Sequence, residues 1–377
     1  MDKKLLGGLS AREFLADYWQ KKPLLIRGAI PEFRNLLSLP ELFDLAGRDD
    51  CESRLITGSG KKWTLEHGPF DPRDLGAMPR RNWTILVQGL NTLLPAADAL
   101  MRRFAFVPYA RLDDLMVSYA VQGGSVGPHV DSYDVFLLQG EGRRRWRISG
   151  QRDLDLDPRA PLKLLRDFRP EQEWVLEAGD MLYLPPHIAH EGTALDPCMT
   201  YSIGFRAPSA QELSAQFLGF LQERVQLEGM YADPDLRLQS DPARISDDFL
   251  HQIAAMLGRI RWGRSDIEAF VGQYLSEPKA HIQFQRPERP LNRKQFERTI
   301  KELGLHLSPF SLMLYRGHSV YLNGEARQPP ETWRAALRKL ANNRTLEPGG
   351  KLASGLIDLL YEWYEAGYVQ LGHQNER

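Results

Sequence analysis

Between Leu112 and Arg206 the sequence is almost wholly a series of short apolar or alternating runs, separated by Gly, Pro and Asp residues. The runs are LDDLMVSYAVQ, DVFLLQ, RRRWRI, EWVLEAG, DMLYLP and MTYSIGFR. Short strands with turn residues between them are typical of antiparallel architectures in which two sheets pack together or one sheet closes on itself. We therefore predict a double-sheet jelly roll, whose open end can hold a metal ion.

A candidate metal site lies within GPHVDSYDVFLLQGEGRRRWRI, the stretch from Gly127 to Ile148. His129 and Asp131 are two residues apart, and in an extended strand residues at this spacing project to the same side. With a second histidine from a distant strand they would form the 2-His-1-carboxylate group of non-haem Fe(II) oxygenases. A His-x-Asp pair alone is also compatible with a polar turn before a strand.

A third ligand is available downstream, in AGDMLYLPPHIAHEG. Either His187 or His190 could complete the group. Pro185 and Pro186 make the backbone around these histidines irregular, so their spacing does not decide between them.

The arginine-rich run can be interpreted by strand parity. Arg144 shares one face with Trp146 and Ile148, which makes it the inward arginine. A buried guanidinium needs a carboxylate partner, and its planar fork suits bidentate binding of one. That partner is either an Asp or Glu of the protein or the carboxylate of a ligand. The other face of the run, directed outward, carries Arg143, Arg145 and Arg147.

Four motifs in this order resemble the bacterial ribosomal oxygenases. They are FLADYWQKKPLLIRG, RLDDLMVSYAVQGGSVGPHVDSYDVFLLQGEGRRRWRI, LYLPPHIAHEG and YSIGFRAP. This family consists of JmjC-type hydroxylases that depend on Fe(II) and 2-oxoglutarate and modify an arginine of the large-subunit ribosomal protein uL16. The resemblance is densest over the first two hundred or so residues and continues more loosely to the C-terminus.

The resemblance implies a role for each matching residue. It makes His129, Asp131 and His190 the iron ligands. Arg144 and Ser118 match the residues that bind the distal carboxylate of 2-oxoglutarate, and no catalytic residue beyond the metal centre is implied. His187 stands where the family pattern has a glycine.

The fold class expected from the patterns and the resemblance together is α+β, in three parts. Residues 1–207 would form the JmjC-type, cupin-like jelly-roll catalytic domain, 208–285 a helical dimerisation region and 286–377 a winged-helix-like domain. Ser209 with Glu212 is a capping-box sequence, which predicts the first helix of the middle part. The apolar helical faces of this part need a partner surface, and the resemblance implies homodimerisation through it.

Smaller elements are predicted on both sides of the jelly-roll runs. A capping box at Ser10 and Glu13 predicts a helix that ends before Pro23, and RLITGSG with KKWTLEHGPF predicts a hairpin around Gly58 to Gly60. Strands at LMLYRG and VYLNG, with helices around them, resemble the small winged-helix-like domain that ends the chains of this family. The acidic residues Glu362 and Glu365 in its last helix argue against a DNA reader.

Composition limits the cellular context. The net charge of the 377-residue chain is −1, so no overall field attracts it to nucleic acid. Two cysteines, Cys51 and Cys198, are too few for a disulfide framework, which suits a reducing cytoplasm. No apolar stretch approaches the length of a membrane span, and the first residues lack a signal-like apolar run.

The function that the resemblance implies is hydroxylation of the β-carbon of an arginine in uL16, by Fe(II), 2-oxoglutarate and O2. One alternative is a JmjC-type hydroxylase or demethylase of another protein side chain, which would keep the same metal ligands. The other is a cupin-like module that binds the ribosome without catalysis.

Overall fold

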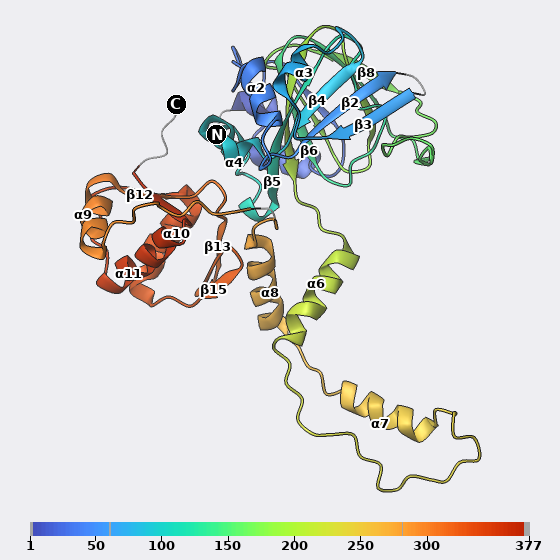
Figure 1. The fold of residues 1–377 in the computed structure, drawn as a ribbon, viewed down its shortest axis with the longest axis vertical. Coiled ribbons are helices and arrows are strands. Elements are labelled where there is room, and N and C mark those ends of the chain that lie inside the picture. Colours follow the sequence, from blue (N-terminus) through green and yellow to red (C-terminus); the bar gives the residue numbers. More distant parts are fainter. Residues whose placement is uncertain (1–2, 60–61, 281, 373–377) are drawn as a thin grey trace.

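The structure is a computed structural model, and it describes residues 3–59, 62–280 and 282–372 of the chain. Figure 1 shows a β-rich body, a C-terminal unit beside it, and a group of helices that extends away from both. The candidate site lies in the β-rich body.

The β-rich body contains two antiparallel sheets that face each other. The large sheet has eight strands in the order β1-β9-β6-β11-β5-β4-β2-β3, and the small sheet has three in the order β10-β7-β8. The strands of the large sheet are β1 (Leu24–Ile26), β2 (Ser53–Ser59), β3 (Lys62–His67), β4 (Trp83–Val87), β5 (Leu112–Ala120), β6 (Val135–Glu141), β9 (Met181–Leu184) and β11 (Cys198–Phe205). The strands of the small sheet are β7 (Arg144–Ser149), β8 (Gln172–Leu176) and β10 (Ala189–Ala194).

Alternation along β6 shows how the layers form. Leu137 packs with Trp146 and Ile148 of the small sheet in one apolar cluster. Phe136 and Leu138 point to the other side of the large sheet, where they join the main core. That core is completed by the N-terminal elements η1 (Lys3–Leu6), α1 (Ala11–Asp17), α2 (Leu39–Ala46), α3 (Pro72–Gly76), α4 (Leu90–Leu93), α5 (Pro95–Arg102) and η2 (Tyr109–Arg111).

The strands largely follow the sequence pattern. The six predicted runs after Leu112 form β5, β6, β7, β8, β9 and β11. The capping box of Ser10 and Glu13 forms, and the predicted hairpin is β2 and β3, although residues 60–61 at its turn lie outside the described residues. Strand β10 was missed, because AHEGTA has no apolar alternation and was interpreted as a loop.

The middle part contains α6 (Ala210–Gln222), α7 (Asp247–Leu257) and α8 (Arg264–Ser276). Ser209 caps α6 by accepting a hydrogen bond from the backbone N–H of Glu212. The Glu212 carboxylate does not return to the cap as a capping box requires; it accepts a hydrogen bond from the Tyr274 hydroxyl, which ties α6 to α8. Helix α7 has no buried residue, and Figure 1 shows it at the end of a long arm.

The C-terminal unit has its own apolar core. Its elements are α9 (Arg293–Leu303), β12 (Leu305–Leu307), β13 (Met313–Arg316), β14 (Ser319–Leu322), β15 (Glu325–Arg327), α10 (Glu331–Asn343), β16 (Thr345–Leu346), α11 (Ser354–Glu365) and β17 (Val369–Leu371). Strands β13, β14 and β15 form one small sheet, and β16, β12 and β17 form another. None of the helices in the described residues is both long and apolar enough to cross a bilayer.

Helix α8 packs on the β13-β14-β15 sheet. A Cβ atom at Gly272 would lie 2.4 Å from the ring of Tyr321, so only glycine allows this approach. The Tyr321 hydroxyl donates to the Glu268 carbonyl at 3.3 Å, and Gln273 Nε2 donates to the Gly324 carbonyl at 3.0 Å. The domain boundaries at residues 207 and 285 stay predictions. Helix α8, which lies before residue 285, contacts the C-terminal unit, which lies after it.

A buried ionic cluster joins the C-terminal unit to the jelly roll. Asp98 of α5 is 3% exposed and lies 3.0 Å from Arg102 Nη2 and 4.0 Å from Arg344 Nε. Arg344 also donates to the carbonyls of Ser308 and Ser311, each at 2.9 Å. Because a buried charge is stable only when it is paired and hydrogen-bonded, this cluster holds the two units in one arrangement.

The same interface predicts how stability depends on pH. Burial lowers the pKa of His306, and the nearby cations Arg344 and Arg102 lower it further. The unfolded chain takes up a proton below the ordinary value of 6.5 while the folded protein holds the ring neutral, so stability falls as pH drops below 6.5. We expect His306→Gln to lose less free energy of unfolding than wild type on acidification, measured by urea titration. Equal losses in the two proteins would contradict this.

Candidate active site

Three potential metal ligands meet in the jelly roll. Atoms of His129, Asp131 and His190 all lie within 4.8 Å of one another. Asp131 Oδ2 is 3.9 Å from Nε2 of His129 and 3.6 Å from Nε2 of His190. The backbones of the two histidines exchange hydrogen bonds of 3.0 and 2.9 Å, so two segments far apart in sequence are locked side by side.

The hydrogen bonds of the imidazole rings prepare both for metal binding. His129 Nδ1 lies 2.9 Å from the Gly127 carbonyl, and His190 Nδ1 lies 2.9 Å from the Ile188 carbonyl. Each Nδ1–H therefore donates to a carbonyl, which leaves the Nε2 lone pair directed at the cluster. Burial lowers the pKa of His190 to about 4, with the neighbouring His129 as the next cause, so this ring is neutral near neutral pH. A neutral imidazole is the form that binds a metal.

His187 is excluded from this cluster by the backbone. Its side chain is exposed, and its φ is +64°, in the left-handed region that glycine adopts without strain. This conformation explains why a glycine is expected at the position. The backbone N–H of His187 donates to the Asp131 carbonyl at 2.8 Å, so the residue supports the site through its main chain.

Arg144 is buried on the inner side of β7, as strand parity predicted, with 6% exposure. Its Nη1 donates to Ser118 Oγ of β5 at 3.2 Å. Its Nε and Nη2 are buried and have no hydrogen-bond partner within the described part of the chain. An unpaired buried guanidinium is costly, so the internal carboxylate considered from sequence is not what satisfies it. These free donors fit the carboxylate of a ligand.

Two of the three arginines predicted to face outward have carboxylate partners, whereas Arg145 is half-buried and its Nε has no hydrogen-bond partner among the described residues. Arg143 pairs with Asp196 at 2.7 Å, and Arg147 pairs with Glu191 across the β7-β10 ladder. Their exposure contrasts with the burial of Arg144, as the alternation of a strand requires.

Two further groups near the cluster were missed from sequence. Asp114 lies on β5 four residues before Ser118, so both project from the same face. Burial raises the pKa of Asp114. Partial burial raises the pKa of Tyr133, and the charges of Asp131 and Asp114 raise it further, which places Tyr133 near both carboxylates. The parity applied to the arginine run could have identified Asp114.

Known proteins resemble this chain over most of its length. A JmjC domain model matches residues 99–213, and a ROXA-like winged helix model matches residues 259–370. The chain is 35% identical over 336 residues to the ribosomal protein uL16 3-hydroxylase of Escherichia coli, and the alignment covers 89% of each protein. The chain belongs to the JmjC-type ribosomal oxygenases. Both the family and the fold class predicted from sequence are thereby confirmed.

Solved structures of this family match 97% of the chain. The ribosomal oxygenase YcfD from Escherichia coli in complex with cobalt and 2-oxoglutarate has a TM-score of 0.83 and 32% identity, covering 97% of this chain and 99% of that one. The same enzyme with cobalt and succinic acid gives 0.82 and 33%, with coverage of 97% and 99%. The roles of the five site residues stay predictions.

Proposed function

We propose that this ribosomal oxygenase uses Fe(II), 2-oxoglutarate and O2 to hydroxylate the β-carbon of an arginine in the large-subunit ribosomal protein uL16. One observation carries the proposal: the same jelly roll holds a His-Asp-His cluster and the buried guanidinium of Arg144, two nitrogens of which have no hydrogen-bond partner among the described residues. The name of the Escherichia coli relative supplies the substrate protein and the carbon position.

The residues present fit both groups. His129 and His190 would offer Nε2 and Asp131 a carboxylate oxygen, a ligand set that suits Fe(II) and leaves positions open. The two free nitrogens of Arg144 would bind the distal carboxylate of 2-oxoglutarate, and the hydroxyl of Ser118 would steady both. Iron with 2-oxoglutarate and O2 supplies the oxidising chemistry when bound.

The protein's own contribution is to bind, orient and exclude water. The β7 and β5 strands fix Arg144 and Ser118 from two different sheets, so their geometry is rigid. Asp114 and Tyr133 would hold the guanidinium of the substrate arginine, since a buried carboxylate close to a tyrosine suits a guanidinium. No side chain beyond the metal ligands is needed as an acid or base.

The test is mass spectrometry of large-subunit ribosomal proteins from cells that lack this gene, after incubation with the enzyme, Fe(II), ascorbate and 2-oxoglutarate. We expect a gain of one oxygen on an arginine of uL16. Consumption of 2-oxoglutarate without that gain would point to another side chain as the substrate. Neither consumption nor gain would support the binding module without catalysis.

We further propose that the helical part forms a homodimer. Its exposed apolar side chains include Leu218 (66%), Leu250 (53%), Leu257 (59%) and Trp262 (55%). An apolar helix face left in water is typical of an interaction site, and no residue of α7 is buried within the described part of its own chain. Sedimentation should give a dimer, and Leu250→Asp with Leu257→Asp should give a monomer. A wild-type monomer at micromolar concentration would contradict the proposal.

We also propose that the enzyme acts in the cytoplasm, because its proposed substrate is a ribosomal protein. The two buried cysteines, Cys51 and Cys198, are free thiols, which are compatible with a reducing compartment. The division into a catalytic part (1–207), a dimerisation part (208–285) and a winged-helix-like part (286–377) is part of this proposal. So is the absence of a DNA partner.

A further inference from the structure

A cleft of about 940 Å³ lies between the jelly roll and the C-terminal unit. The jelly-roll wall includes Leu112 and Asp114 of β5. The opposite wall is built by the chain that follows α8, with Phe284, and by Phe310 and Ser311 of the C-terminal unit. The cleft is at the upper end of the size range of small-ligand pockets, and two parts of the fold contribute to it.

The rim of the cleft is acidic. Its carboxylates, apart from Asp98, are Asp49, Asp50, Glu52, Asp113, Asp114 and Glu277. Several of these charges are paired: Arg102 and Arg344 flank Asp98, Lys279 pairs with Asp113 at 3.1 Å, and Arg48 pairs with Asp50 at 2.7 Å. Arg206 also lines the cleft, and Asp49, Glu52, Asp114 and Glu277 lie outside these pairs. Negative charge therefore remains at the rim, where it favours a cationic partner and repels phosphate.

The cleft and the candidate active site share strand β5. Asp114 lines the cleft and lies on the same strand face as Ser118. A smaller cavity of about 300 Å³ shares Asp113 and Glu277 with the cleft and is also lined by Tyr133. Tyr133 lies two residues after Asp131 in the chain, so this cavity adjoins the segment that carries the predicted metal ligand.

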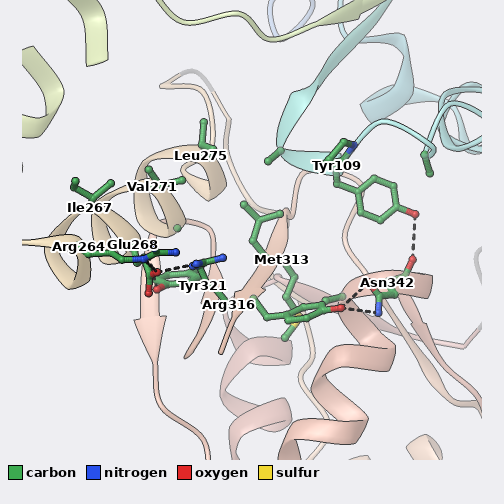
Figure 2. A pocket seen from close by; sticks show the side chains of 17 residues that line it. Tyr109, Arg264, Ile267, Glu268, Val271, Leu275, Met313, Arg316, Tyr321 and Asn342 are labelled. Carbon is green, nitrogen blue, oxygen red and sulfur yellow. Dashed lines mark hydrogen bonds and ion pairs between the residues drawn. The ribbon is translucent and has the colours of Figure 1, made fainter. Parts of the chain in front are cut away.

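An apolar pocket adjoins the cleft. It has a volume of about 750 Å³ and shares Tyr109, Ala110 and Leu275 with the cleft. Figure 2 shows it between Tyr109, α8 and Met313 of the C-terminal unit. The hydrogen bond of 3.1 Å from the Tyr109 hydroxyl to the Asn342 carbonyl closes one side. A peptide segment that filled both the acidic cleft and the apolar pocket would need cationic and apolar side chains close together in its sequence.

We propose that the acidic cleft is the docking groove for a basic, extended segment of the substrate protein, with an apolar side chain of that segment in the adjoining pocket. The proposal rests on the proposed function, because the reacting residue is itself a cationic arginine. In this arrangement the winged-helix unit is one wall of a protein-binding groove. A nucleic acid does not fit the groove, since its phosphates would meet the carboxylates of the rim.

The test is charge reversal at the exposed rim with a matched control. Asp49→Lys with Glu277→Lys reverses two exposed rim acids on opposite walls. Asp17→Lys with Glu347→Lys makes the same change in net charge at exposed positions outside the three cavities. For hydroxylation of isolated uL16, we expect the rim variant to raise KM about tenfold at low salt with kcat nearly unchanged, and added salt to reduce the difference. The control should keep the wild-type KM.

A binding measurement separates this proposal from the proposed function. Fluorescence anisotropy of labelled uL16 with cobalt-loaded enzyme reports docking whether or not hydroxylation occurs. We expect the rim variant to bind about tenfold more weakly than wild type and control. Three results would each contradict the docking groove: equal affinity in all three proteins, no binding of uL16 to wild type, or tighter binding of an RNA duplex than of uL16. If the rim variant binds uL16 more weakly but no protein hydroxylates it, the docking groove is supported and the proposed reaction is contradicted.

Discussion

His190→Ala should lose metal binding and reduce hydroxylation by more than about 100-fold, since removing even an outer-shell partner of a metal ligand costs about 10–100-fold. The imidazole is 2% exposed, its Nδ1 is held by the Ile188 carbonyl, and its Nε2 lies 3.6 Å from Asp131. Two remaining ligands cannot hold the ion firmly. Metal content after dialysis against Fe(II) or Co(II), together with oxygen incorporation into uL16, measures both effects.

The matched control is His187→Gly, three residues earlier in the same segment. The His187 side chain is exposed at a φ of +64°, and glycine adopts that backbone conformation more easily. We expect this variant to keep full metal content and activity, with equal or slightly higher stability. Circular dichroism of both variants shows whether His190→Ala still folds. Loss of metal in His187→Gly, with metal retained in His190→Ala, would reverse the assignment of the third ligand.

Arg144→Ala should raise the Kd for 2-oxoglutarate by about 30-fold or more, because removing one partner of a buried charge pair costs about 2–5 kcal/mol. Its two unpaired nitrogens are the buried donors that we assign to the distal carboxylate. Arg143→Ala removes a neighbouring exposed arginine that pairs with Asp196, and we expect it to leave the Kd unchanged. Isothermal titration of the cobalt-loaded proteins with 2-oxoglutarate measures the difference. Similar affinities in the two variants would contradict the assignment.

Arg144→Met separates ligand binding from folding. Without ligand, the wild-type guanidinium is buried with two unsatisfied nitrogens, so a neutral side chain of similar length should leave stability equal or higher. Excess 2-oxoglutarate should stabilise the wild type by about 2.7 kcal/mol at 100 times its Kd, and should not stabilise Arg144→Met. Thermal unfolding of the cobalt-loaded proteins with and without 2-oxoglutarate measures both effects. A variant that is less stable and still responds to 2-oxoglutarate would show that Arg144 is structural.

Local periodicity was enough to predict several features of this site. The period of two along a strand placed Arg144 inside with Trp146. That prediction succeeds because the direction of a side chain in a strand depends only on its own backbone. The order of short strands predicted the jelly roll for the same reason, since each run carries its own alternation and turn residues. His129 and Asp131 do lie close together, but they precede β6, and His129 makes only an isolated bridge with His190, so strand alternation is not the reason.

Strand β10 could not be predicted from its local sequence pattern. AHEGTA has neither alternation nor strong strand formers, and it becomes a strand because β7 pairs with it, with His190 opposite Ile148. That pairing brings the ring of His190 into the cluster and leaves the side chain of His187 exposed. The family resemblance had implied the same choice without a geometric reason.

Sequence by itself determined the strand faces, the presence of ligand types at suitable spacing, and the family. Tertiary structure decided which histidine meets Asp131, and it brought Asp114 toward Tyr133 from a separate segment. It also decided that jelly roll and C-terminal unit enclose an acidic cleft. The physical reason is that contacts between distant segments depend on how whole layers pack, whereas the face on which a side chain lies depends on a few neighbouring dihedral angles.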